Sequence, residues 1–288
     1  MKILVLGGDG MLGHTLFNLL AAKHEVRVTL RLELGAYSAA RLFNASNAYA
    51  GIDARSPSSV DKVLAEFRPA AVVNAIALVP QRADSKDTLA NLEINALFPH
   101  RLAQMCAAVG ARLIHISTDG VFSGARGNYR EEDRPDPPDV YGQCKLLGEV
   151  SGGGAITLRT AIVGLGLTRK TGLIDWFLQQ REPVRGYRNA FFSGVTAKEL
   201  ARVIEMLMTK FAGAAGLYHF SAGAISKYEL LINLRDRLKL STEIFADDSV
   251  RIDRSLDSTR FRAEFSYAPP SWDAMLGELA GDIRARQA

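Results

Sequence analysis

The sequence predicts an α/β fold in which a doubly wound parallel sheet is interleaved with a smaller C-terminal substrate lobe. Three observations lead to this prediction. Short apolar runs alternate with segments of helical periodicity, which is typical of buried parallel strands and the helices that connect them. A glycine-rich turn follows the first apolar run directly. Beyond Gly164 the alternation weakens, which indicates a second lobe.

The first apolar run, residues 2–7, predicts a strand, and residues 11–22 predict a helix. The turn between them reads GGDGMLG. Its glycines allow a tight turn and a close approach of the backbone to a pyrophosphate, and the helix N-terminus offers free N–H groups to phosphate. An ordinary strand-to-helix turn can carry the same glycines, but this position favours a Rossmann dinucleotide site. The predicted cofactor-binding residues here are Gly7, Gly10, Met11, Leu12 and Gly13.

The next strand, EVRVTLR, ends near Arg31. An arginine at this position can accept a 2′-phosphate, whereas an acidic residue would hold the ribose hydroxyls. Arg31 therefore predicts NADPH as the cofactor, although nearby Glu33 leaves NADH open. A third strand ends at Asp53, which is a candidate for the adenine ring, and an unliganded loop aspartate is the alternative.

Ser56 and Pro57 predict the start of a helix that runs through Phe67. The apolar run 70–78 predicts a strand with small residues near its end. Because ligands bind outside the carboxyl ends of parallel strands, Ala75 and Ala77 are candidates for cofactor contact, and tight core packing is the alternative. Residues 87–109 predict a helix that Pro99 kinks or divides.

The later elements are assigned from the same patterns. Residues 112–117 predict a strand, and the proline-rich segment 123–139 is typical of an exposed loop that can move. A strand over 155–159 follows a glycine break. The remaining predicted elements are helices over 171–180, 196–208, 226–238 and 270–284, and a strand over 216–221.

A proton-transfer site is predicted where the 112–117 strand ends. Tyr141 and Lys145 are four residues apart in a predicted helix and therefore lie on one face. The strand end can place the Thr118 hydroxyl beside them. A free tyrosine has a pKa near ~10, which a neighbouring cation lowers. A surface Tyr–Lys pair and a strand-capping threonine are the alternatives, but the glycine-rich turn favours the catalytic interpretation.

Composition limits the function classes. The chain has 288 residues, with 35 basic and 31 acidic residues and no long basic run, so we expect no nucleic-acid partner. The ten residues between Pro69 and Pro80 are too few to span a bilayer, and no membrane association is expected. Two cysteines, Cys106 and Cys144, indicate a reducing cytoplasm. No metal site is expected, and a homodimer is compatible with the sequence.

Five motifs occur in one order: GGDGMLG, NAIA, IHISTDGVF, YGQCK and LRTAIVG. Together they resemble the extended short-chain dehydrogenases/reductases, and within them the family of dTDP-4-dehydrorhamnose reductases and related nucleotide-sugar enzymes. The resemblance implies NADPH-dependent reduction of a nucleotide-diphospho-4-keto-6-deoxysugar. Tyr141 would protonate the carbonyl oxygen, Thr118 would hydrogen-bond it, and Lys145 would also bind the nicotinamide ribose. The expected substrate-binding residues are Thr118, Asp119, Phe122, Arg188 and Arg254, the arginines gripping the diphosphate.

The chain departs from that family pattern in substrate-facing regions. Gly120 stands where the reductases have tyrosine, and the segment 78–87 lacks their usual tyrosine and threonine. Segments 192–196 and 254–258 also differ, which leaves the sugar and the base open. An epimerase or a dehydratase on the same scaffold is an alternative, although the glutamate that dehydratases carry after the Thr-Asp pair is missing. A non-catalytic NADP-binding regulatory subunit is another, although the Tyr–Lys pair is present.

The predicted domain division follows these patterns. Residues 1–164 form the dinucleotide-binding domain, which residues 191–220 rejoin. Residues 165–190 and 221–288 form the substrate-binding lobe.

Overall fold

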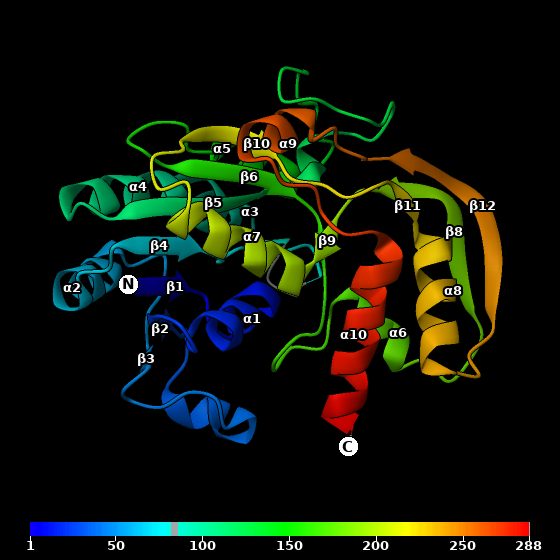
Figure 1. Ribbon diagram of the computed structural model, residues 1–288, viewed down its shortest axis with the longest axis horizontal. Helices are drawn as coiled ribbons and strands as arrows, with labels where there is room; N and C mark the ends of the chain where they lie inside the picture. Colours follow the sequence, from blue (N-terminus) through cyan, green and yellow to red (C-terminus); the bar gives the residue numbers. More distant parts are fainter. Residues whose placement is uncertain (82–85, 288) are drawn as a thin grey trace.

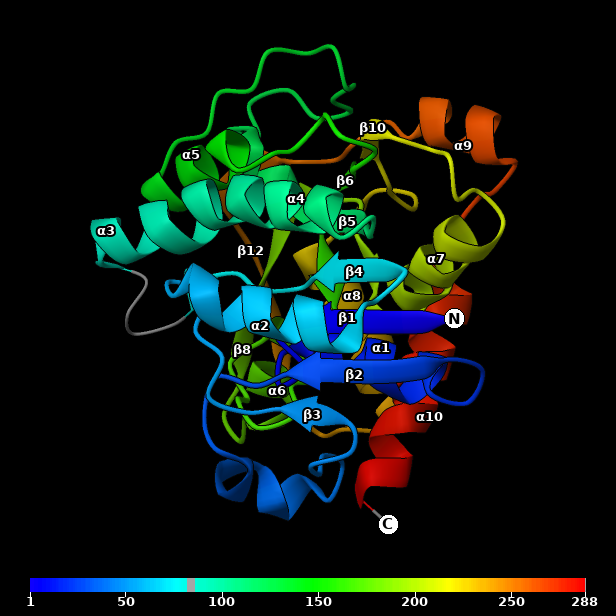
Figure 2. The same cartoon turned by 90° about the vertical axis from the view of Figure 1, so that its left-hand side faces the viewer.

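The computed structural model describes residues 1–81 and 86–287 and confirms the predicted α/β fold. Its main sheet has seven parallel strands in the order β10-β6-β5-β4-β1-β2-β3. Starting from β1 in the interior, the order grows outward in both directions, as in dinucleotide-binding folds. Figure 2 shows β4, β1, β2 and β3 stacked in this order. The strands are β1 (Lys2–Leu6), β2 (Glu25–Thr29), β3 (Ala48–Tyr49), β4 (Ala71–Asn74), β5 (Arg112–Thr118), β6 (Ile156–Thr160) and β10 (Gly216–His219).

Helices cover both faces of this sheet (Figure 1). In β1 the fully buried side chains of Ile3 and Val5 join one core cluster, and those of Leu4 and Leu6 join the other. The first cluster includes α1 (Met11–Leu20) and α7 (Ala197–Thr209). The second includes α2 (Pro57–Phe67) and α4 (Phe98–Ala108). Burial on both faces explains why the main strands read as short, continuous apolar runs.

The second lobe is built on a three-stranded sheet in the order β11-β8-β12, on the right of Figure 1. A third core cluster joins this sheet to its helices. The lobe elements are α6 (Leu173–Leu178), β8 (Val184–Phe192), β11 (Ile225–Ser226), α8 (Lys227–Leu238), β12 (Ile244–Asp253) and α10 (Trp272–Gln287). A short parallel pair, β7 (Ile162–Val163) and β9 (Val195–Thr196), lies at the junction, and α9 (Thr259–Phe265) packs near β10.

One predicted strand is shorter in the structure. Strand β4 ends at Asn74 rather than at residue 78. Beyond it, the buried Asn95 amide donates to Leu78 O (2.8 Å) and its oxygen accepts from Leu78 N (3.0 Å), so side-chain bonds replace strand pairing. The 87–109 region is divided as predicted, into α3 (Thr88–Asn91), a π-helical stretch (Leu92–Leu97) and α4, with Pro99 in the first turn of α4.

The segment 123–139 is more firmly anchored than its composition suggests. Tyr129 is 5% exposed, and its N–H donates to Ser255 O (2.9 Å). It also forms an isolated parallel bridge with Leu256. Many other residues of the segment are exposed, as the prolines and charges predicted, and the buried Tyr129 ring anchors the loop against Ser255 and Leu256.

None of the described helices is long and apolar enough to cross a membrane.

Candidate active site

The glycine-rich turn is packed too tightly for any other residue type at two positions. A Cβ at Gly13 would lie 2.0 Å from Gly7 O, and one at Gly8 would lie 2.5 Å from the Cβ of Val28. Gly7 has a φ of +82°, which glycine adopts without strain. Helix α1 begins after Gly10 without a side-chain cap, so its first N–H groups can face a phosphate. This turn fits a dinucleotide pyrophosphate.

The other predicted cofactor residues lie at neighbouring strand ends. Arg31 is exposed just after β2, and its charge acts on Asp53. The Asp53 carboxylate is bonded chiefly to Arg55 (Nη2–Oδ2, 2.7 Å), which holds the pKa of Asp53 below its usual value. Ala75 lies against the glycine turn, because its N–H donates to Leu6 O (3.2 Å) and its carbonyl is 3.4 Å from the Cβ position of Gly7. Ala77 follows on the same partly exposed segment.

Helix α5 (Val140–Leu147) carries Tyr141 and Lys145 to the end of β5. The Asp139 side chain caps it by accepting from Gly142 N (2.7 Å). Lys145 is 1% exposed, and its Nζ donates to Ile116 O (2.8 Å). Burial lowers the pKa of Lys145 to about 8, and the charge of Glu149 opposes this shift. A buried lysine anchored beside the strand end is thus poised between its two protonation states near neutral pH.

Tyr141 and Thr118 are brought together at the same point. Burial raises the pKa of Tyr141 to about 12, and a hydrogen bond with Thr118 and the charge of Arg254 oppose the shift. The expectation that a cation lowers the tyrosine pKa is therefore outweighed by burial. Tyr141 is protonated at neutral pH and can act as an acid. The Thr118 hydroxyl also accepts from Gly120 N (3.0 Å), which fixes its orientation.

The lobe supplies two cations to this end of β5. In its sheet, Phe191 pairs with Ser226 on one side and with Asp253 on the other, so Lys227 and Arg254 follow the same row of residues. Their charges both act on Asp119. Burial raises the pKa of Asp119 to about 6 against the pull of both cations. Besides Lys145, the site therefore combines the Tyr141 phenol, the Thr118 hydroxyl and two cations from the lobe.

A family model described as the RmlD substrate binding domain matches residues 1–284. The chain belongs to this family. A dTDP-4-dehydrorhamnose reductase from Streptomyces griseus is 43% identical over 100 residues, which cover 34% of this chain and 33% of that protein. The methionine adenosyltransferase 2 subunit beta of Xenopus laevis is 29% identical over 199 residues, which cover 64% of this chain and 59% of that protein. The chain thus spans a third and about three fifths of these two relatives.

Among solved structures, a dTDP-4-dehydrorhamnose reductase from Bacillus anthracis in complex with NADP has a TM-score of 0.78. It is 21% identical and covers 98% of this chain and 99% of its own. This likeness confirms the fold over nearly the whole length, including the second lobe.

A buried ion pair lies behind the active site of this RmlD-family chain, and sequence reasoning missed it. Arg159 and Glu149 form two bonds of 2.7 Å, and their side chains are 4% and 10% exposed. Ser117 donates to the same Glu149 carboxylate (2.7 Å), and Arg159 contacts His219 Nε2 (3.3 Å). The pair ties the residue before Thr118 to the end of the helix that carries Lys145. In the sequence, the only indication of a role for Glu149 was that it follows Lys145 by four residues.

Two predicted substrate residues lie elsewhere. Phe122 is completely buried and stacks on Tyr129, with ring centroids 4.2 Å apart, so its ring supports the site from behind rather than facing a ligand. Arg188 is exposed and pairs with Asp248 on the surface of the β8–β12 sheet.

Lys227, by contrast, faces the site but was not predicted from the sequence. Its signal was the sequence Ser226-Lys-Tyr-Glu229, which forms a complete capping box and places Lys227 at the start of α8.

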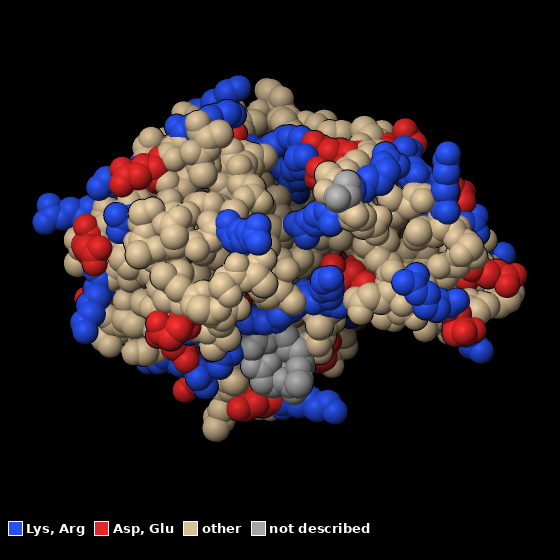
Figure 3. Space-filling view, turned by 90° about the horizontal axis from the view of Figure 1, so that it is seen from below, with Lys and Arg blue, Asp and Glu red and all other residues tan. Residues whose placement is uncertain are grey.

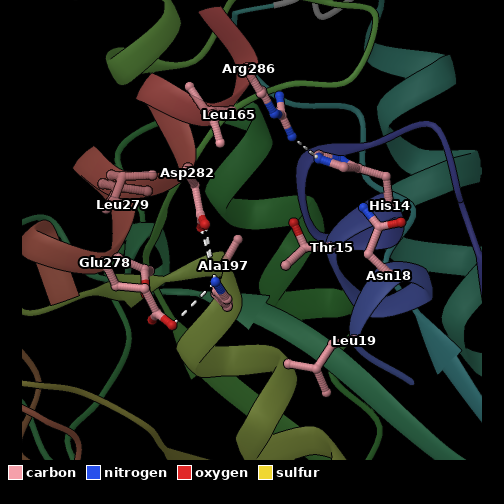
Figure 4. A pocket seen from close by; sticks show the side chains of 15 residues that line it. His14, Thr15, Asn18, Leu19, Leu165, Ala197, Glu278, Leu279, Asp282 and Arg286 are labelled. Atoms are coloured by element: carbon pink, nitrogen blue, oxygen red, sulfur yellow. Dashed lines mark hydrogen bonds and ion pairs between the residues drawn. The ribbon is translucent and has the colours of Figure 1, made fainter. Parts of the chain in front are cut away.

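A cavity of about 400 Å³ lies apart from these residues, between α1, α7 and α10 (Figure 4). Its charged side chains are paired internally. Lys198 bonds to Asp282 (3.1 Å) and Glu278 (3.2 Å), and Arg286 donates to His14 Nε2 (2.8 Å). The His14 ring in turn donates from Nδ1 to Gly10 O (2.8 Å). This cavity lies between the helix that follows the glycine-rich turn and the C-terminal helix, and its lining does not include Thr118, Tyr141 or Lys145.

Proposed function

We propose that this protein reduces the 4-keto group of a nucleotide-diphospho-4-keto-6-deoxysugar with NADPH, in the manner of the dTDP-4-dehydrorhamnose reductases, for the synthesis of glycan precursors. The observation that carries the proposal is the convergence of Thr118, Tyr141 and Lys145 at the end of β5, in a chain of the RmlD family.

The cofactor fits the residues at the strand ends. The glycine turn, which a Cβ would fill, suits the pyrophosphate, and Arg31 suits the 2′-phosphate. NADPH when bound supplies the hydride. NADH is the alternative cofactor, and the Kd values of NADPH and NADH distinguish the two.

The residues of the chain supply the proton and the charge. Tyr141 donates its phenolic proton to the sugar carbonyl oxygen as that oxygen gains negative charge. Thr118 donates a hydrogen bond to the same oxygen and positions it. The Lys145 ammonium holds the cofactor ribose and favours the phenolate that Tyr141 leaves behind. Lys227 and Arg254 face the site from the lobe and suit the substrate diphosphate. Lys and Arg side chains also border the central hollow seen from below (Figure 3).

The direct test is to mix the purified protein with NADPH and a panel of dTDP-, UDP- and GDP-linked 4-keto-6-deoxysugars and to follow oxidation of the nicotinamide. We expect stoichiometric consumption of NADPH with at least one sugar. Tyr141→Phe should lower kcat by about 10²- to 10⁴-fold, because the acid is lost, while the Kd for NADPH stays nearly unchanged. Turnover close to the wild-type rate in that variant would contradict the assigned acid.

A regulatory, non-catalytic role is the second candidate, favoured by the similarity to the methionine adenosyltransferase subunit. It predicts NADPH binding without oxidation across the whole sugar panel. An epimerase on the same scaffold would convert its substrate without net consumption of cofactor. Oxidation of NADPH in the same assay separates the reductase from both alternatives. Analysis of the sugar after the reaction separates an epimerase, which converts its substrate, from a regulatory subunit, which leaves the sugar unchanged.

We further propose that residues 1–164 with 191–220 bind the dinucleotide and that residues 165–190 and 221–288 bind the sugar. The protein works in the cytoplasm, which is supported by two buried cysteines that form no disulfide, Cys106 and Cys144.

We also propose that the protein is a homodimer. In the part of the chain that the structure describes, apolar side chains are exposed on α3, the π-helical stretch and α5, which contact one another. This surface, the α3–α5 surface, consists of Leu89, Leu92, Leu97, Val140 and Leu147.

A further inference from the structure

An acidic residue lies inside the glycine-rich turn. Asp9 is 8% exposed, and its Oδ2 is 3.5 Å from the Tyr37 hydroxyl. That hydroxyl accepts a hydrogen bond from Leu32 N (3.2 Å). Asp9 therefore faces the residues that follow β2, where a dinucleotide places its adenosine ribose.

Asp9 and Arg31 favour opposite cofactors at this position. A carboxylate near the ribose accepts hydrogen bonds from the 2′- and 3′-hydroxyls, but it repels a 2′-phosphate, which carries up to two negative charges. Arg31, which follows β2, favours the phosphate. The cofactor preference therefore depends on whether the charge of Asp9 is compensated.

The Arg169 guanidinium compensates the negative charge of Asp9, and it comes from a segment outside the main sheet. Its Nη2 lies 3.0 Å from Asp9 Oδ2. The Asp9 side chain is 9% exposed and that of Arg169 is 42% exposed, so the guanidinium covers the acid and keeps an open side. Arg169 lies in the segment 164–172, which leads into α6 of the second lobe.

The segment that carries Arg169 is held in place by its own contacts. Gly166 N donates to Asp175 Oδ2 (2.8 Å), and a Cβ at Gly166 would lie 1.9 Å from Arg169 O. Arg286 donates to Gly166 O (3.1 Å) and, with its other nitrogen, to His14 (2.8 Å), as Figure 4 shows for the His14 contact. Since His14 is bonded to Gly10 O, one arginine of α10 fixes the Arg169 segment relative to the turn that carries Asp9.

We propose that Arg169 is a cofactor-specificity residue supplied by the second lobe, which neutralises Asp9 and so admits the 2′-phosphate of NADPH to the glycine-rich turn. Without Arg169, the exposed charge of Asp9 turns the same site toward NADH. The inference rests on the proposed function only in requiring that a nicotinamide dinucleotide binds, and it does not depend on which sugar is reduced.

The test measures the Kd of NADPH and of NADH separately, by quenching of protein fluorescence, for the full chain and for Arg169→Gln, Asp9→Asn and the double variant. Arg169→Gln should weaken NADPH binding roughly tenfold or more and change NADH binding by less than about twofold. Asp9→Asn should tighten NADPH binding. The double variant should regain most of the affinity for NADPH, since the acid that Arg169 masks is gone.

A matched control is Arg185→Gln, which removes an exposed arginine paired with Asp247 on the lobe sheet. It should leave both Kd values unchanged, and thermal melting of each variant reports whether it is folded. Equal weakening of NADPH and NADH by Arg169→Gln, or no recovery in the double variant, would overturn the inference. A wild-type protein that binds NADPH but reduces no sugar would defeat the proposed function alone, whereas one that binds neither cofactor would defeat both.

Discussion

Lys145 combines complete burial, one backbone hydrogen bond and a pKa of about 8, so its charge changes within the working pH range. It is cationic below that pKa and neutral above it. In the proposed mechanism the phenolate left by Tyr141 needs a neighbouring cation, so we expect kcat to fall as the pH rises through about 8. A pH–rate profile at saturating substrate measures this, and a rate that stays flat through pH 9 would contradict the assigned role of Lys145.

Glu149 gives a second measurement on the same residue. Its charge raises the pKa of Lys145, so Glu149→Gln should lower that pKa and move the alkaline fall in kcat to a lower pH. A purely structural role for Glu149 would lower the rate at every pH without moving the profile.

Glu149→Gln also breaks the buried pair with Arg159 and leaves the charge of Arg159 uncompensated. We therefore expect this variant to lose about 3–5 kcal/mol in the free energy of unfolding.

At the scale of elements, the contact between β1 and α1 depends on Gly13. A Cβ there would lie 2.0 Å from Gly7 O, and because that oxygen belongs to the backbone, the turn must widen. Gly13→Ala should therefore lower the free energy of unfolding by about 1–3 kcal/mol and weaken binding of NADPH and NADH alike. Gly35→Ala is the matched control, because a Cβ at Gly35 meets no atom within 4 Å. Urea unfolding and cofactor titration measure both effects, and identical behaviour of the two variants would contradict the close approach.

The elements that the sequence predicted well are those whose pattern follows from burial. Strands β1, β5 and β6 are covered on both faces and read as apolar runs. Strands β8 and β12 were missed because neither reads as an apolar run. Strand β8 alternates buried and less buried residues, and β12, IFADDSVRID, is mostly exposed and carries four charged residues. The helix predicted from residue 196 begins there, and the Thr196 hydroxyl caps it by accepting from Glu199 N. The Glu199 carboxylate bonds to Arg202 and Tyr267 instead of returning to the Thr196 backbone, so the capping box is only half formed.

At the scale of the whole molecule, the predictable part of the site is the part that is local in sequence. Tyr141 and Lys145 share one helix turn, and the glycines share one loop. Lys227, Glu149 and the Asp9–Arg169 pair depend on how the lobe and the distant strands pack, and Asp9 and Arg169 lie 160 positions apart. The periodicity of apolar residues does not reveal contacts between residues this far apart in the sequence. Arg254 was predicted from the sequence, but Lys227 and the convergence of both cations on Asp119 follow only from the row Ser226–Phe191–Asp253.

The α3–α5 surface makes the oligomeric state testable. Leu89 is 72% exposed and Leu147 is 61% exposed, and both lie on helices that contact each other. Exposed apolar side chains on neighbouring helices are stabilised by burial against a second copy related by a two-fold axis. We expect sedimentation to show a dimer for the wild type and a monomer for Leu147→Glu, since a carboxylate in that interface would be desolvated without a partner. Val109→Glu, at an exposed position that ends α4, is the control and should remain dimeric. A monomeric wild type, or a Leu147→Glu variant that stays dimeric, would show that this surface does not join two copies of the chain.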